Sequence, residues 1–168
     1  AYAHPNFIVP FETRRRDPLL SYEWHLLNQG QLGGKVGADI KATRAWEHTL
    51  GKGAVLAIID AGFELSHPDL DDAWLVNEKE IPANSIDDDV NGLVDDVIGW
   101  NFAANSADVE DRTTNYHGTL VAGVAAARAN NKGVVGVCPE CKVIPILASN
   151  TIAGAAAAFH YAAARGAH

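Results

Sequence analysis

An aspartate and a histidine, far apart in the chain, have the residue types and neighbours that proton-transfer chemistry needs. Asp60 ends the continuous apolar run 54–59, and Gly62 follows it closely. His117 opens a run of very small residues, which predicts a helix that packs closely on its neighbours. Histidine titrates near neutrality and is the most common general base. We therefore expect function at Asp60 and His117, although for Asp60 alone a structural cap on the turn at Gly62 explains the residue equally well.

The elements around these two residues predict an α/β fold. The apolar runs 54–59 and 142–147 do not alternate with polar residues, which is typical of parallel strands covered on both faces. The alanine-rich stretch 119–129 predicts a helix between them, and a strand–helix–strand order implies a right-handed crossover. Asp60 would then lie just beyond the carboxyl end of a strand, where such sheets gather functional groups.

Two further helices are expected. Asp39 is a suitable N-cap for a helix over 41–49 that Gly51 would end in a left-handed conformation, with buried positions at Ile40, Ala45 and Trp46. The segment 152–165 predicts a closing helix with one apolar face, formed by Ile152, Ala156, Phe159 and Ala163. A helix in this pattern returns the chain to the sheet, so we expect a further strand and a fold that is interrupted at residue 168.

Composition limits the classes of protein. The 168 residues are 48% apolar and carry a net charge of −8, so one globular domain is expected and wholesale disorder is excluded. Binding to nucleic-acid phosphates needs clustered Lys and Arg residues, so we expect no nucleic-acid partner. The apolar runs are too short to span a bilayer, so we expect no insertion into a membrane. We expect residues 1–20 to be an extended arm or linker and residues 21–168 to be the domain. The chain lacks methionine, so we expect its start to have been removed or not included.

Four motifs, in this order, resemble the subtilisin-like serine peptidase family: Asp60-Ala-Gly62, His67-Pro-Asp-Leu70, His117-Gly-Thr-Leu-Val-Ala-Gly123 and Gly133-Val-Val-Gly-Val137. The resemblance covers about residues 20–168. It implies a three-layer αβα fold with a mainly parallel sheet, of which this chain holds the N-terminal part. It also implies a serine endopeptidase that acts on proteins or peptides, is secreted or periplasmic, and is made as a zymogen.

The resemblance assigns roles to two of the three triad residues. Asp60 would hold the imidazole of His117 in one tautomer, and His117 would take the proton of a serine hydroxyl. The chain has five serines, and none stands in the Gly-Thr-Ser context of the family's nucleophile. Ser149 follows a strand edge where the family has a substrate-groove loop, so we reject it as the nucleophile. Ala61 departs from the polar residue that is usual beside the aspartate.

The serine and the oxyanion-hole asparagine are therefore expected on a missing or separate segment. That segment would be the C-terminal part of the same peptidase domain, either removed from this chain or present as a second chain. The alternative is a catalytically inert fragment or interaction module that binds calcium.

The acidic stretch 87–96, hereafter the acidic loop, predicts a calcium site. Its carboxylates and amide stand at alternate positions, and Gly92 allows a sharp turn. Ile98 stands where an EF-hand has a bidentate glutamate, so this is not an EF-hand, and a solvated acidic loop is the alternative. The expected ligands are Asp87, Asp89, Asn91, the backbone carbonyl of Leu93, and Asp95.

The resemblance also implies a second calcium site. Asp69 and Asn130 match the family's ligand positions, and the backbone carbonyls of Arg128, Lys132 and Val134 would complete the shell. The competing interpretation is that Asp69 caps a turn and that residues 130–133 are simply a helix exit.

Two remaining motifs suggest local structure and processing. Cys138 and Cys141 predict a turn that is either disulfide-bonded or reduced, because a second ligand pair for zinc is missing. Residues 2–7 resemble the end of the family's inhibitory propeptide. The arginines at 14–16 are either a processing site or a solvated run.

Overall fold

A small parallel sheet positions the two candidate catalytic residues. The computed structural model describes residues 17–168, and within them strands β1 (Val55–Ile59), β3 (Lys142–Leu147) and β2 (Trp100–Asn101) lie in the order β1-β3-β2. Val55 lies opposite Lys142, and Trp100 lies opposite Ile146, both in parallel register. The strands expected at 54–59 and 142–147 are thus present, and the expected α/β class is confirmed.

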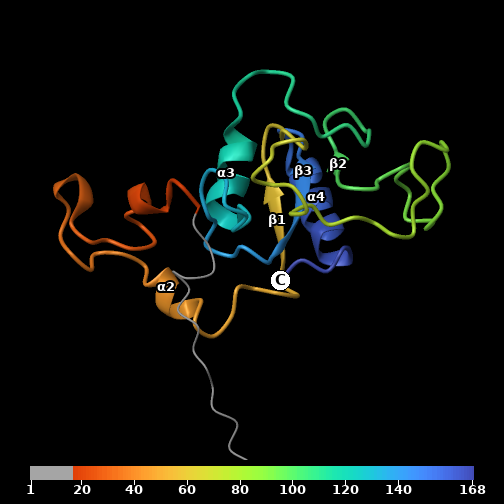
Figure 1. Cartoon of the computed structure of the whole chain (residues 1–168). Coiled ribbons are helices and arrows are strands. Elements are labelled where there is room, and N and C mark those ends of the chain that lie inside the picture. The colour runs from red at the N-terminus through yellow and green to blue at the C-terminus, as the bar shows by residue number, and fades with distance from the viewer. Residues whose placement is uncertain (1–16) are drawn as a thin grey trace, which may run out of the picture.

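Helices α3 (His117–Ala126) and α4 (Ile152–Ala164) cover opposite faces of this sheet (Figure 1). Val143 packs with Ala122 and Ala126 of α3, whereas Ile144 and Ile146 pack with α4. This division follows from the pleat, because successive side chains of a strand point to opposite faces. Helix, sheet and helix therefore form the three layers expected of the fold.

Helix α4 has the expected length but packs through a different face from the one predicted. Ala158, Tyr161 and Ala162 are buried against the sheet. Small side chains let the helix approach the isoleucines of β3 closely, and the hydrogen bonds of Tyr161 fix its rotation. The predicted face is the outer one, with Ile152 92% and Phe159 67% exposed, and it consists of Ile152, Ala156, Phe159 and Ala163.

The helix predicted at 41–49 is shorter than expected. Helix α2 (Ala42–Ala45) begins after Lys41, which has a left-handed φ of 60°. The Asp39 carboxylate accepts hydrogen bonds from the amides of Lys41 and Asn28, so it shapes the preceding turn instead of capping the helix itself. Trp46 is buried as predicted, whereas Ile40 and Ala45 are exposed.

Residues 17–20, within the arm expected at 1–20, include one buried side chain, that of Asp17, and are otherwise half-buried or exposed. Leu20–Tyr22 form the 3₁₀-helix η1, Leu19 donates its amide to Gly133, and Asp17 is 5% exposed. A second 3₁₀-helix, η2, spans Gln31–Gly33. The propeptide-like residues 2–7 and the arginines at 14–16 lie outside the described residues, and the division at residue 20 stays a prediction. No helix within residues 17–168 is long and apolar enough to cross a bilayer.

The turn before β3 is disulfide-bonded. Cys138 and Cys141 are joined, and Cys141 is fully buried. Gly51 lies directly against both sulfur atoms, with the left-handed φ of 88° that the sequence predicted at this position. The bridge therefore packs against the turn at Gly51, which lies between α2 and β1.

Candidate active site

Asp60 and His117 meet at the carboxyl edge of the sheet. The Nδ1 atom of His117 lies 2.8 Å from one carboxylate oxygen of Asp60 and 3.0 Å from the other. The Asp60 side chain is 12% exposed, whereas that of His117 is 63% exposed. A carboxylate at Nδ1 favours the tautomer that carries its proton there, which leaves Nε2 unprotonated in the neutral ring.

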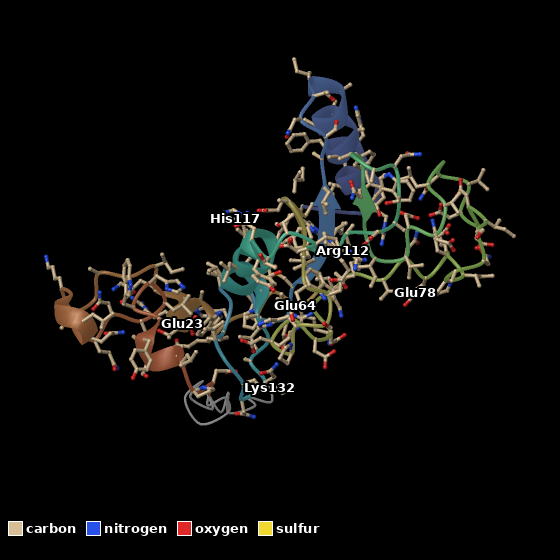
Figure 2. The ribbon with its side chains drawn as sticks, turned by 90° about the horizontal axis from the view of Figure 1, so that it is seen from above. Glu23, Glu64, Glu78, Arg112, His117 and Lys132 are labelled. Atoms are coloured by element: carbon tan, nitrogen blue, oxygen red, sulfur yellow. A yellow bond between two sulfur atoms is a disulfide. The ribbon has the colours of Figure 1, made fainter. Side chains whose placement is uncertain are left out.

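The backbone brings the two residues together from different elements. Asp60 follows β1 directly, and its amide donates to the carbonyl of Ile146 on β3. His117 is the first residue of α3, and Figure 2 labels it at that end of the helix. Gly118 makes the approach feasible, because a Cβ atom there would lie only 3.0 Å from Cβ of Asp60.

A cavity of about 400 Å³ adjoins Asp60, lined among others by Asp60, Ala103 and Asn150. Ser149 also lines it, but its hydroxyl forms a hydrogen bond with Thr151 and none with His117. Among residues 17–168, no group hydrogen-bonds to Nε2 of His117. Nε2 of His117 can therefore accept a proton from a further group.

Two of the predicted ligands in the acidic loop lie close together, and a third carboxylate from outside the loop, which sequence reasoning missed, lies beside them. Carboxylate oxygens of Asp87, Asp89 and Glu80 lie within 4.8 Å of one another. Glu80 is 5% exposed, and its two oxygens accept the amides of Asp89 and Asp95. It stands seven residues before the loop without an alternating pattern, so the sequence carried no signal for it.

The other predicted ligands of the acidic loop have different contacts. Asp95 accepts the amides of Asn84 and Ser85, outside the cluster of three carboxylates. The amide of Leu93 donates to the side-chain oxygen of Asn91, and the Asn91 amide donates to Asp87. The structure thus brings Asp87 and Asp89 together and does not place Asp95 with them.

A second group of carboxylates is buried around Asp69. One Asp69 oxygen accepts the amide of Val134 at 2.8 Å, and the other, although buried, has no partner among residues 17–168. Asp17 has the same character: one oxygen accepts the amide of Asn130 at 3.0 Å, and its buried second oxygen has no partner. Buried, unpaired carboxylate oxygens are costly without a cation. The donor set therefore fits a hard cation such as Ca²⁺.

The pKa shifts of the carboxyls around Asp69 also favour a cation at this position. Burial raises the pKa of the Asp69 carboxyl, and the nearby charge of Asp17 adds to the increase. Burial also raises the pKa of Glu23, which lies close to both. Figure 2 shows Glu23 and Lys132 on one side of the molecule, and Glu78, which precedes the acidic loop, on the other. The two groups of carboxylates are thus separate in space.

Comparison with known proteins identifies the family. The sequence model of the Subtilase family matches residues 51–165. The chain is 46% identical over 91 residues to subtilisin-like protease 1 of Plasmodium vivax, and 35% identical over 145 residues to neuroendocrine convertase 2 of Rattus norvegicus. These alignments cover 53% and 83% of this chain. The chain therefore belongs to the subtilase family.

Solved structures agree with this fold. The serine protease of Aeromonas sobria is 28% identical, with a TM-score of 0.61 over 79% of this chain. The chain spans only a part of its relatives: 14% of the Plasmodium protein, 20% of the convertase and 20% of the Aeromonas chain.

Proposed function

We propose that this chain supplies Asp60 and His117 to the catalytic triad of a serine endopeptidase. The observation that carries the proposal is the 2.8 Å contact between Nδ1 of His117 and the Asp60 carboxylate. That contact holds the ring in the tautomer in which Nε2 can accept a proton. Membership of the subtilase family supports the same roles for these two residues.

In this mechanism, Nε2 of His117 removes the proton from a serine hydroxyl as the oxygen attacks a peptide carbonyl. His117 then gives that proton to the leaving amine, and Asp60 stabilises the imidazolium without becoming protonated itself. In the second half of the reaction, Nε2 of His117 takes a proton from water as the water oxygen attacks the acyl carbon. His117 then returns that proton to the serine oxygen, which leaves, and the acid product is released. The serine and the oxyanion-hole asparagine come from a segment outside residues 1–168.

That segment is proposed to be the C-terminal part of the same domain. The outer face of α4 is apolar, and on α3 Leu120 is 65% and Val124 is 55% exposed. Exposed apolar surfaces of this kind mark places where another segment packs. The substrates would be proteins or peptides, and the family relationship favours a secreted or periplasmic protein that is processed from a zymogen.

Calcium is the proposed structural ion at both groups of carboxylates. In the acidic loop, Glu80, Asp87 and Asp89 would hold it, and the predicted Asn91, Leu93 and Asp95 stay candidates. Around Asp69, the ligands would be Asp17, Asp69 and Asn130, with the carbonyls of Arg128, Lys132 and Val134. The support is the hard oxygen donors and, at the second site, the two buried oxygens without partners.

The alternative function is an inert calcium-binding fragment or interaction module. The test is an active-site label on the protein purified from its native host. A fluorophosphonate probe is applied, followed by denaturing electrophoresis and intact mass. Labelling of a co-purifying or contiguous segment, abolished by H117A and D60N but not by H48A, supports the peptidase. His48 is exposed and distant from the site, so it is the matched control. A preparation that contains this chain and takes no label overturns the proposal.

A further inference from the structure

Asp111 lies where the segment after Asp60 meets the segment before His117. Its amide donates to the carbonyl of Phe63 at 2.9 Å, and the Phe63 amide donates to Val109 at 3.0 Å. A Cβ atom on Gly62 would lie 2.8 Å from Cα of Asp111, so the two backbones are in direct contact. The backbone of Asp111 is therefore fixed to the segment that carries Asp60.

The side chain of Asp111 holds the turn that leads into α3. One carboxylate oxygen accepts the amide of Thr113 at 2.7 Å and its hydroxyl at 2.6 Å. The other oxygen accepts the amide of Tyr116 at 2.6 Å. The hydrogen bonds from Thr113 lower the pKa of Asp111, so the acceptor is ionised near neutrality. This carboxylate thus connects the Asp60 segment to the residue immediately before His117.

The turn needs such an anchor, because its backbone is in an uncommon conformation. Thr114 and Tyr116 have left-handed φ values of 62° and 53°. Tyr116 stands at the N-cap of α3 and offers no side-chain cap. Residues with side chains disfavour this region of φ, so hydrogen bonds from outside the turn must maintain it.

We propose that Asp111 is a positioning residue that fixes the imidazole of His117 against Asp60. The proposal rests on the proposed function. The His117 side chain is 63% exposed, so side-chain packing constrains it little and its orientation depends on the backbone at Tyr116 and on the bond to Asp60. Loss of the Asp111 carboxylate would release Tyr116 and let the ring leave Asp60.

The tautomer of the His117 ring shows directly whether the ring is hydrogen-bonded to Asp60. In a free histidine side chain the proton prefers Nε2, whereas a hydrogen bond from Nδ1 to Asp60 makes the Nδ1–H form dominant. Nitrogen-15 NMR of the 168-residue chain measures the two forms at about pH 8, above the ordinary histidine pKa of about 6.5. A turn that is only structural would change stability without changing this ratio.

Three variants and one control carry the test. D111A is expected to lower the ratio of Nδ1–H to Nε2–H about fivefold, the change that one net hydrogen bond supplies. D111N keeps one acceptor and should fall between D111A and the wild type. T113V, which removes one of the three hydrogen bonds, should shift the ratio least. D108N is the matched control, because the Asp108 carboxylate accepts hydrogen bonds from Glu110 and Arg112 on the same loop but from neither Thr113 nor Tyr116.

The outcomes separate this proposal from the proposed function. If wild-type His117 is already in the Nε2–H form, the Asp60 pair is absent and both proposals are overturned. If the wild type is Nδ1–H and D60N changes it, but D111A remains folded with an unchanged ratio, only the role of Asp111 is overturned. If D111A unfolds and loses its dispersed spectrum, D111N and T113V provide the test. A wild-type ratio of Nδ1–H to Nε2–H in both of these variants would overturn the positioning role of Asp111.

Discussion

The hydroxyl of Tyr161 donates a 2.7 Å hydrogen bond to the carboxylate of Asp96, and this contact joins helix α4 to the acidic loop. Asp96 is completely buried and also accepts the side chain of Arg165 at 3.1 Å. Its other oxygen accepts the side-chain amides of Asn77 at 3.1 Å and Asn91 at 3.2 Å. A single carboxylate therefore connects the candidate cation loop to the helix that covers one face of the sheet.

Removal of the Tyr161 hydroxyl should destabilise the fold. Burial raises the pKa of Tyr161, so its hydroxyl is a neutral donor at all ordinary pH values. Y161F leaves a buried carboxylate with one donor fewer and is expected to lower the free energy of unfolding by about 1–3 kcal/mol in urea denaturation. Y22F is the control, because the Tyr22 side chain is 65% exposed and its loss should cost less than about 0.5 kcal/mol. Equal effects of the two variants would contradict the role of the Asp96 contact.

Gly51 should be far less tolerant of alanine than Gly53. Both have left-handed backbones, with φ values of 88° and 89°. A Cβ atom on Gly51 would overlap the disulfide sulfurs, whereas one on Gly53 meets nothing within 4 Å. G53A therefore measures the backbone cost alone, about 1–2 kcal/mol, and G51A should exceed it clearly in thermal unfolding. Similar melting temperatures for the two variants would show that the contact with the disulfide does not constrain this turn.

Calcium should stabilise the protein through two separable sites. At about one hundred times its dissociation constant, one bound ion adds about 2.7 kcal/mol to the unfolding free energy. D17N and D87N are each expected to remove part of the calcium-dependent rise in melting temperature and to lower the bound calcium measured by elemental analysis. D71N is the control, because Asp71 is exposed and belongs to neither group of carboxylates. A rise in melting temperature that survives D17N and D87N combined would exclude both sites.

Without calcium, Glu23 and Asp69 should contribute less to the unfolding free energy as the pH rises. Burial raises the pKa values of Glu23 and Asp69 above their ordinary values of 4.5 and 3.8. A carboxyl with a raised pKa in the folded state stabilises the fold below its unfolded pKa and loses that contribution at higher pH. Carboxyls with lowered pKa values, such as Asp72 and Asp108, contribute with the opposite sign, so the test compares variants. In urea denaturation with a chelator present, at a series of pH values above about 4, the unfolding free energy of E23Q relative to the wild type should rise with pH, whereas that of E47Q, at an exposed position, should stay constant.

The sequence alone determined strands β1 and β3, the helix between them, the closing helix and the two residues proposed for the triad. The strand 142–147 was predictable because a fully buried parallel strand is an unbroken apolar run in the chain. Asp60 and His117 were identifiable because their motifs are local: a strand end and a helix start.

Only the tertiary structure decided which groups share a site and which helix faces are buried. Asp17 became a candidate ligand because folding buries its carboxylate beside Asp69, which is distant in sequence, and Glu80 because folding buries it beside Asp87 and Asp89 without a sequence pattern that marks it. The buried face of α4 could not be predicted, because a helix that is apolar all round has no periodic contrast. The hydrogen bond from Tyr161 to Asp96 holds α4 in its observed rotation about the helix axis. Local patterns specify elements, whereas long-range hydrogen bonds and packing specify how those elements turn toward one another.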